Sequence, residues 1–500
     1  MIMCAYMLAL VASGSGCSGG EDRAYSRGST VVVAYPYETV VDETAEYLVF
    51  LTMVSYDENG ELEGRLARSW EYSPDYRDVT YHLRTNIRWH DGVPVTAHDI
   101  KFSMELLTHP DVLEEAPGYF GAVKVVDDST LTLRGGNAST DEVYYPKHLL
   151  EDLEPKNFHN WDFWNQPVGN GPYRFVRYVP QTLMEFEANP DFYDGEPKIE
   201  RVVLKFVGGA GLTELLSGNV DAVTETNPAQ IPKLASDPRF RAYHSLAVWW
   251  IQRALYWRND HVLFRNPDVR RALTLAINRK ELLGVLNLPQ DIPIVDAPYT
   301  LTQLRRGQLP EPLPYDPARA RALLDAAGWQ ERTADGVRER DGTEFRFTAL
   351  VGTLPMNREI AVYIQDQLRR VGVAMDIQTL PNLNVFARIQ EGNFEAALSA
   401  FTIGFLQRFH FGERYPLGYE NAELVTLADQ GNSNWDPETN DRIYRRLAEI
   451  FRADVPVTFL FPHVNTTFAH RRLRGLSSPW RADPVVFMED LWLEEESPQR

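Results

Sequence analysis

The sequence predicts a mixed α/β fold with more than one core-sized unit. The clearest evidence is a strand pattern at residues 345–351, an amphipathic helix pattern at 356–370 and, after Gly372, a second strand pattern at 374–379. A strand, a helix and a strand in this order form a βαβ unit, which is the building block of parallel sheets. At 500 residues, with 44% hydrophobic and 24% charged residues, the chain is long enough for two to four globular units.

The first strong local pattern lies between residues 66 and 103. Residues 80–84 alternate between polar and apolar side chains, as in a half-buried strand. Asp91 and Gly92 then form a dipeptide that favours a tight turn. Thr96 and Asp99 have the spacing of a capping box ahead of an apolar periodic run. An amphipathic helix is therefore expected to begin just after Thr96.

Later elements are marked by turn and cap residues. The stretch 167–172 reads Pro-Val-Gly-Asn-Gly-Pro and predicts a turn that enters a strand at 173–178. A phosphate-binding loop is disfavoured there, because no Lys-Ser/Thr follows and no helix opens. The remaining expected elements are a helix at 268–278, a helix capped by Asp316-Pro317, a helix at 440–452 after Asp436-Pro437, and a short apolar strand at 455–461.

The charge balance excludes one class of partner. The formal net charge is -20, and nucleic-acid phosphates require a basic face, so nucleic-acid binding is not expected. Solubility is a sufficient explanation of the acidity.

Both cysteines lie near the amino terminus. Cys4 sits inside an apolar run at residues 2–12, which is too short to span a bilayer but suits the apolar region of a signal peptide. The small residues before Cys17 resemble a bacterial lipobox, so residues 1–17 are expected to form a lipoprotein signal ending at a lipidated Cys17. Two departures, no basic residue before the apolar run and Gly14 in place of the usual Leu, leave a misassigned start or an inefficient leader open.

Motifs of common enzymes and metal sites are missing from the body of the chain. Beyond residue 20 the sequence has no H-E-x-x-H, G-x-S-x-G, C-x-x-C or G-x-G-x-x-G. The histidines are not spaced as metal ligands: His463 and His470 are seven residues apart, and three others fall across a strand, a turn and a helix start. No metal, cofactor or catalytic residue is therefore predicted.

Several ordered motifs carry a family resemblance. They are Trp89-His90-Asp91-Gly92, the turn at 167–175, Asn189-Pro190-Asp191-Phe192-Tyr193, the stretch 216–222, Asn266-Pro267-Asp268-Val269-Arg270 and Tyr315-Asp316-Pro317 with Ala327-Gly328-Trp329. In this order the sequence resembles the bacterial extracytoplasmic solute-binding proteins of family 5, the peptide- and nickel-binding receptors of ABC importers. The resemblance covers roughly residues 30–462.

The resemblance implies a two-lobed periplasmic-binding-protein fold of type II. Lobe I would comprise residues 18–50, 169–262 and 477–500, with a subdomain at 51–168 inserted into it. Lobe II would comprise residues 263–476. Because the chain would cross between the lobes, closure could bury a ligand in the cleft.

The same resemblance implies a ligand site lined by aromatic and charged residues. The expected ligand-binding residues are Tyr37, Glu38, Tyr119, Glu225, Trp250, Phe401, Phe405 and Arg408. Pockets of this kind are mostly apolar with a few oriented polar groups. Arg408 would meet a carboxylate, and a solvated arginine is the alternative interpretation.

One departure bears on the ligand. Peptide-binding members carry an Asp that pairs with the α-ammonium of the peptide, and Gly404 stands at its place here. A buried ammonium without a carboxylate is costly, so a free-amine peptide is in doubt unless Glu38, Glu225 or Glu413 supplies the charge. His410 is of interest because the nickel-chelate branch uses a histidine in the corresponding lobe; a satisfied or solvent-facing histidine is the alternative.

The expected function is capture without catalysis. The protein would be a monomeric, membrane-anchored lipoprotein outside the cytoplasmic membrane that binds an oligopeptide or similar amphiphilic solute and passes it to ABC permease subunits. A nickel-chelate or opine-like receptor is the first alternative. An envelope hydrolase or sensor on the same fold is the alternative from another class.

Overall fold

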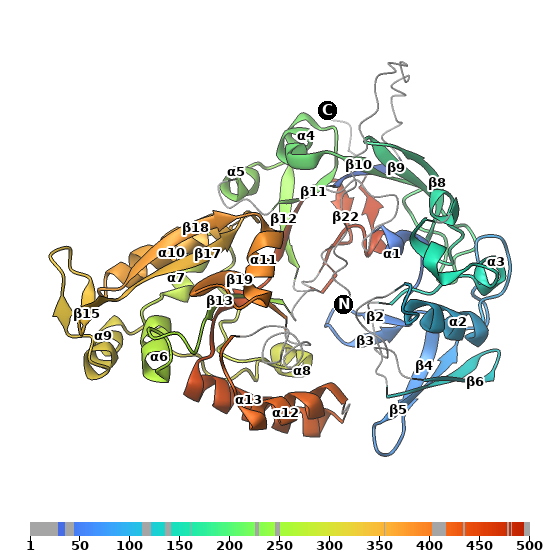
Figure 1. Cartoon of the computed structure of the whole chain (residues 1–500). Coiled ribbons are helices and arrows are strands. Elements are labelled where there is room, and N and C mark those ends of the chain that lie inside the picture. The colour runs from blue at the N-terminus through green and yellow to red at the C-terminus, as the bar shows by residue number, and fades with distance from the viewer. Residues whose placement is uncertain are drawn as a thin grey trace.

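The computed structural model describes residues 29–35, 45–112, 122–135, 142–160, 162–225, 230–245, 251–354, 356–402, 417–433, 436–477, 480–481 and 483–494; the side chains at 159, 160, 162, 225, 401, 402, 432 and 433 are outside this description. Within it, two large sheets lie in separate halves of the molecule, as Figure 1 shows. The mixed α/β prediction is confirmed.

The first half is built on a seven-stranded sheet with the order β12-β21-β11-β1-β10-β9-β8. β1 pairs in parallel with β10 and with β11, and the other pairings are antiparallel. The strands are β1 (Thr30–Tyr35), β8 (Tyr173–Val179), β9 (Leu183–Ala188), β10 (Arg201–Phe206), β11 (Ala222–Glu225), β12 (Phe240–Ser245) and β21 (Asn465–His470).

The second half is built on a five-stranded sheet with the order β18-β17-β19-β13-β20. β17 pairs in parallel with β18 and with β19, whereas β13 is antiparallel to β19 and β20. The strands are β13 (Ile251–Trp257), β17 (Arg346–Gly352), β18 (Ala374–Leu380), β19 (Ala396–Thr402) and β20 (Val457–Pro462). The predicted βαβ unit is confirmed as β17, α10 (Asn357–Arg369) and β18.

Smaller sheets complete the fold. A four-stranded sheet β4-β5-β7-β6 and the two-stranded sheet β2-β3 lie in the segment expected as an insertion, and two further short sheets lie elsewhere. The strands are β4 (Ala67–Tyr72), β5 (Asp78–Leu83), β6 (Val123–Asp127), β7 (Thr130–Arg134), β2 (Val54–Tyr56), β3 (Leu62–Gly64), β14 (Glu331–Arg332), β15 (Arg338–Arg340), β16 (Thr343–Glu344), β22 (Leu473–Arg474) and β23 (Trp492–Leu493).

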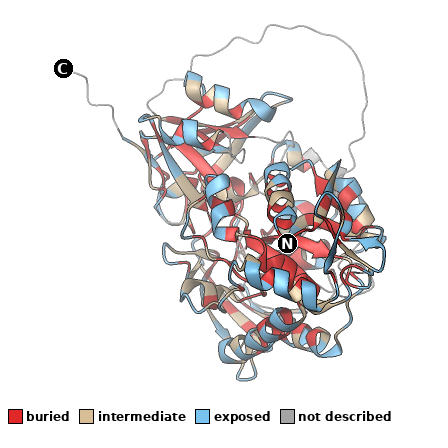
Figure 2. Ribbon diagram, turned by 90° about the vertical axis from the view of Figure 1, so that its left-hand side faces the viewer, coloured by how far each residue is buried: buried red, intermediate tan, exposed pale blue. Residues whose placement is uncertain are grey.

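Helices cover the outer faces of the sheets, and buried residues are concentrated beneath them (Figure 2). The remaining described α-helices are α1 (Glu46–Val49), α2 (Ala97–Leu107), α3 (Lys147–Leu150), α4 (Gly211–Ser217), α5 (Ile231–Ala235), α6 (Pro267–Leu275), α7 (Arg279–Val285), α8 (Leu301–Arg305), α9 (Pro317–Ala326), α11 (Asn382–Gln390), α12 (Ala422–Ser433) and α13 (Pro437–Asp454). Short 3₁₀ helices are η1 (Pro155–Asn160), η2 (Asp162–Asn165), η3 (Gly208–Ala210) and η6 (Met488–Asp490).

The predicted caps are confirmed. Thr96 and Asp99 form the reciprocal capping box of α2, and Asp316 and Asp436 accept hydrogen bonds from the first turns of α9 and α13. The helix expected at 268–278 ends earlier, at Leu275. Asn278 accepts a hydrogen bond from the Glu281 amide, and it therefore caps the next helix, α7, instead of extending α6.

The two family motifs around His90 and Gly171 form one contact. The Gly169 amide donates to His90 Nδ1 over 3.2 Å, and the Gly171 carbonyl accepts from His90 Nε2 over 3.1 Å. The turn also lies against α1, since the Asn170 and Gly171 amides both donate to the Val49 carbonyl. A Cβ on Gly169 would lie 1.8 Å from that carbonyl oxygen, so only glycine allows this approach.

The chain passes between the two large sheets twice. β12 ends at Ser245 in the first sheet and β13 begins at Ile251 in the second; β20 ends at Pro462 in the second sheet and β21 begins at Asn465 in the first. These passages precede the boundaries expected at 262/263 and 476/477, because β13 pairs within the second sheet and β21 within the first. The half carrying the seven-stranded sheet is called the first lobe, and the half carrying the five-stranded sheet the second lobe.

Candidate functional site

The carboxyl ends of the parallel strands locate the site. In the second lobe, β17, β18 and β19 end at Gly352, Leu380 and Thr402, and β13 begins directly beside the last of these, with Ile251 opposite Thr402. In open α/β sheets, ligands bind in the crevice outside the carboxyl ends of the strands. This edge of the second sheet therefore adjoins the passage from β12 to β13.

The first lobe presents the matching edge. β1, β10 and β11 are parallel and end at Tyr35, Phe206 and Glu225. Glu225 lies opposite Thr466 at the start of β21, one residue after the second passage. The carboxyl ends of both sheets thus meet the two passages, and a solute held there would contact both lobes.

Most residues that the sequence assigned to the site lie outside the described part of the chain. This is so for Tyr37, Glu38, Tyr119, Trp250, Phe405 and Arg408, and also for Cys17, Gly404, His410 and Glu413. Glu225 and Phe401 are described by their backbones alone, at the carboxyl ends of β11 and β19. Their strand positions agree with the two edges just defined.

Arg253 is a buried cation at this edge that the sequence reasoning missed. It lies on β13 opposite Ala400 and Phe461, and its side chain is 7% exposed. Its Nη1 donates to the side-chain oxygen of Asn357, the first residue of α10, over a long 3.4 Å. Burial lowers the pKa of Arg253 to about 10, so the guanidinium is charged at neutral pH. One sequence signal was available: Arg253 lies within a predominantly apolar strand, where a charged residue is rarely buried.

His463 lies in the second passage, close to Arg253. Its amide donates to the Ile251 carbonyl over 2.7 Å, and its Nε2 donates to the Asn465 side-chain oxygen over 3.0 Å. Burial, followed by the positive charge of Arg253, lowers the pKa of His463 to about 4. The imidazole is therefore neutral at pH 7 and can exchange hydrogen bonds without adding a second charge. We call Arg253, Asn357, His463 and Asn465 the Arg253 cluster.

The loop from β17 to α10 is held close to the cluster. The Asn357 amide group donates to the Gly352 carbonyl, and the Asn382 side-chain oxygen accepts from the Leu354 amide over 3.2 Å. A Cβ on Gly352 would lie 2.2 Å from that Asn382 oxygen, so a larger residue would displace the Asn382 side chain from this position. The N-cap residue of α10, Met356, offers no side-chain acceptor to the first helical turn. This helix start therefore favours an anion.

Apolar side chains are exposed at the same edge of the second sheet. Leu354 follows β17, and Leu383 and Phe386 lie on α11 directly after β18; their exposed fractions are 47%, 71% and 39%. Large apolar side chains at the rim of a charged cluster suit an amphiphilic solute.

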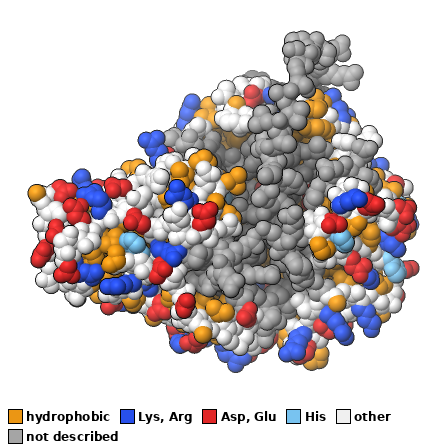
Figure 3. Space-filling view, in the orientation of Figure 1, with side chains coloured by type: hydrophobic (Ala, Val, Ile, Leu, Met, Phe, Trp, Pro, Cys, Tyr) orange, Lys and Arg blue, Asp and Glu red, His pale blue; other side chains and the backbone are white. Residues whose placement is uncertain are grey.

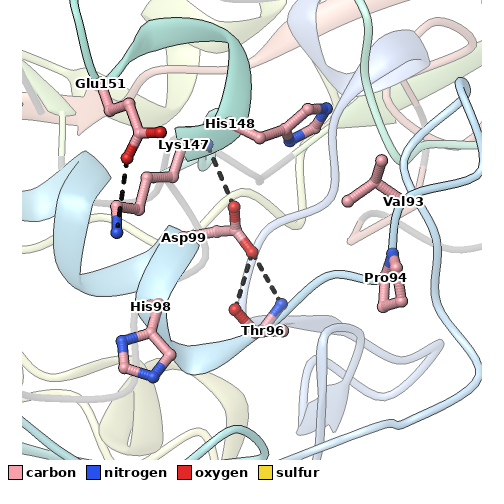
Figure 4. A pocket seen from close by; sticks show the side chains of 8 residues that line it. All are labelled: Val93, Pro94, Thr96, His98, Asp99, Lys147, His148 and Glu151. Atoms are coloured by element: carbon pink, nitrogen blue, oxygen red, sulfur yellow. Dashed lines mark hydrogen bonds and ion pairs between the residues drawn. The ribbon is translucent and has the colours of Figure 1, made fainter.

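A surface depression lies on the inserted subdomain and is shown in Figure 4. The Asp99 carboxylate accepts from the Thr96 amide and hydroxyl and from the Lys147 amide, all within 3.0 Å. Lys147 pairs in turn with Glu151. Because these groups already satisfy one another at helix caps, the depression is a structural feature of α2 and α3 and not the ligand site.

Metal and membrane sites were also considered. Within the described ranges, no group of three or more His, Cys, Asp or Glu side chains is placed to hold a metal ion. No helix in that part of the chain is long and apolar enough to cross a bilayer. Acidic and basic side chains are interspersed among the described residues of the face in Figure 3.

Comparisons with known proteins agree with this architecture. Residues 61–418 match the family model described as bacterial extracellular solute-binding proteins, family 5. The oligopeptide-binding protein AppA of Bacillus subtilis is 24% identical over 481 residues, covering 90% of this chain and 87% of AppA. The nickel-binding periplasmic protein of Escherichia coli is 24% identical over 374 residues, covering 70% of this chain and 69% of that protein.

Solved structures show the same fold. AppA in complex with a nonapeptide has a TM-score of 0.71 at 21% identity, covering 94% of this chain and 99% of AppA. NikZ of Campylobacter jejuni, in complex with Ni(L-His), has a TM-score of 0.75 at 22% identity, covering 93% of this chain and all of NikZ. The two-lobed prediction is confirmed, and the chain belongs to family 5 of the bacterial extracellular solute-binding proteins.

Proposed function

We propose that this protein captures an oligopeptide or similar amphiphilic solute outside the cytoplasmic membrane and delivers it to the permease subunits of an ABC transporter. The observation that carries the proposal is the meeting of both carboxyl-end edges at two chain passages, with the partly buried Arg253 cluster and exposed apolar side chains beside them. The protein acts as a monomer, without catalysis or cofactor. Ligand stabilises the closed state by the difference between its affinities for the closed and open forms.

The ligand lies between the lobes. In this proposal Tyr37, Glu38 and Tyr119 approach it from the first lobe, and Phe401, Phe405 and Arg408 approach it from the second. Glu225 and Trp250 lie beside the passages. The positions of Glu225 at the end of β11 and Phe401 near the end of β19 support this assignment.

The protein is held at the membrane through a lipidated Cys17, with the residues before it removed as a signal. Two acyl chains are sufficient for stable anchoring at about 0.8 kcal/mol per buried methylene. In the native host, Cys17→Ala should move the protein from the membrane fraction to the soluble extract. Unchanged membrane association of that variant would exclude the lipid anchor and leave the binding function intact.

The binding function is tested on purified protein. Mass spectrometry of any solute carried through purification should identify a peptide or another amphiphile, and calorimetry on the stripped protein should give a saturable affinity. Small-angle scattering should then record a smaller radius of gyration with ligand. Conversion of the solute during incubation would instead place the protein in the enzyme class, as the hydrolase alternative requires.

A nickel-chelate receptor is the second candidate. It is favoured by the similarity to the nickel-binding periplasmic protein and to NikZ. In this alternative, His410 would contribute to the chelate. Calorimetry with Ni²⁺ and L-histidine together, on wild type and on His410→Ala, distinguishes it: tight binding of this mixture that is lost in the variant would replace the peptide proposal.

A further inference from the structure

We infer that Arg253 receives a carboxylate of the captured solute, so the protein selects solutes that carry this anion at the passage between the lobes. The inference rests on the proposed function and deepens it, because it names the chemical group that the site selects. It also assigns that role to a residue of β13 and not to Arg408.

The other buried arginines show how this fold normally satisfies a guanidinium. Arg279 pairs with Asp296 and donates to three backbone carbonyls, at Val295, Leu313 and Phe459. Arg338 likewise pairs with Asp325 and donates to three carbonyls, at Trp329, Val371 and Arg321. Arg270 donates to the carbonyls of Phe264, Asp454 and Val455, and the negative charge of Asp454 acts on it as well.

Arg253 differs from all three. Among the described residues its acceptor is the Asn357 amide oxygen alone, at 3.4 Å, although a guanidinium has five N–H donors. No carboxylate of the described chain forms an ion pair with it, and within that part of the chain its pKa is lowered by burial, with no carboxylate acting to raise it. A buried charge without a counter-charge destabilises the unliganded protein, so binding an anion beside it stabilises the complex.

The surroundings also favour an anion over a neutral group. The cation lies at the amino-terminal end of α10, a 13-residue helix whose dipole repels a positive charge and attracts a negative one. The neighbouring His463 is neutral, with Nε2 engaged by Asn465, so it offers no negative charge. An anion placed between Arg253 and the start of α10 would satisfy both.

A carboxylate fits these donors best. Its two oxygens match the planar fork of a guanidinium in a bidentate pair. The exposed Leu354, Leu383 and Phe386 at the same edge leave an apolar surface for the rest of the solute. The predicted substrate class is therefore an amphiphile with a carboxylate, such as a peptide with a free carboxyl terminus.

The test uses N-acetylated Phe-Ala-Leu tripeptides with either a free carboxyl terminus or a carboxyl-terminal amide, titrated by calorimetry into the full-length, ligand-stripped protein. The wild type should bind the acid at least about tenfold more tightly than the amide. Arg253→Gln should reduce the ratio of the two affinities to about one, mainly by weakening the binding of the acid. Arg346→Gln is the matched control, because Arg346 lies on β17 at the opposite, amino-terminal edge of the sheet. The acid-to-amide affinity ratio of this variant should equal that of the wild type.

Folding of the variant is checked independently. If Arg253 serves the ligand and not the fold, the unliganded Arg253→Gln protein should unfold at the same temperature as the wild type or higher, whereas a structural role would lower it. A lower unfolding temperature would overturn the inference. Arg253→Lys, which keeps the charge but loses the fork, should retain an intermediate ratio.

The outcomes separate the two proposals. Equal binding of acid and amide to the wild type would overturn the role of Arg253 while leaving solute capture in place. An acid preference that persists in Arg253→Gln would also overturn it and would return the carboxylate to another cation. Failure of both tripeptides to bind would overturn the inference together with peptide capture.

Discussion

At the scale of single residues, His90 shows how one side chain can join two distant motifs. It accepts from the Gly169 amide through Nδ1 and donates to the Gly171 carbonyl through Nε2, so only the neutral ring with its proton on Nε2 fits. Burial lowers the pKa of His90 to about 4 from an ordinary 6.5.

This shift predicts a specific acid sensitivity. The pKa of His90 is lower in the folded than in the unfolded state, so the unfolded state binds the proton first as the pH falls. The stabilisation that His90 contributes is therefore fully present above pH 6.5 and is lost as the pH drops to about 4. His90 alone should account for about 3 kcal/mol of that loss. Denaturant unfolding at several pH values should show a shallower decline for His90→Gln than for wild type between pH 6.5 and 4. Parallel curves for the two proteins would contradict this role.

At the scale of elements, the turn at 167–172 is positioned by contact with α1. The Asn170 and Gly171 amides donate to the Val49 carbonyl, and a Cβ on Gly169 or Gly171 would overlap it. The glycines of the turn are therefore needed for close packing as well as for turn conformation. The turn thereby fixes the start of β8 against the first lobe.

Gly169→Ala should therefore destabilise the protein by about 3 kcal/mol, since its Cβ would overlap the Val49 carbonyl oxygen and force the turn away from α1. Thermal or urea unfolding measures the effect. Gly209→Ala is the control, because a Cβ there meets nothing within 4 Å, and its change should stay within about 0.5 kcal/mol. Similar losses in both variants would show that the turn can relax.

At the scale of the whole molecule, Arg305 links the two lobes away from the passages. It lies on α8 in the second lobe, donates to the Gly60 carbonyl in the β2–β3 turn of the first lobe, and pairs with Glu61 at 2.7 Å. The Arg305 side chain is 12% exposed and the Glu61 side chain is 62% exposed. Solvent therefore screens the ion pair, which stabilises the lobe contact by at most about 1 kcal/mol. Such a contact favours the present arrangement of the lobes over more open ones without locking it.

Arg305→Ala should shift the unliganded protein toward more open forms. Small-angle scattering should give a larger radius of gyration than for wild type, and ligand affinity should fall by up to about fivefold, since closure loses this contact. Arg306→Ala provides the control, because that neighbouring side chain is exposed. An unchanged radius and affinity in Arg305→Ala would show that the contact does not bias closure.

The sequence by itself determined the local elements and the family fold. The capping box at Thr96, the caps at Asp316 and Asp436, and the βαβ unit are encoded within a few residues of one another, so pattern and spacing suffice to predict them. At α6 the local pattern overextended, because Asn278 suits either a helix end or the cap of a new helix. The strand expected from residue 455 begins at Val457, because Val455 is the C-cap of α13.

The tertiary structure alone decided which distant residues meet. That His90 holds the turn at Gly169 and Gly171, and that β13 belongs to the second sheet, depend on long-range pairing that no local pattern contains. The same is true of Arg253. Its sequence neighbours show a charged residue in a predominantly apolar strand. Only the fold reveals that it is buried at the start of α10 without a carboxylate partner among the described residues, because burial and partners are properties of the packed chain.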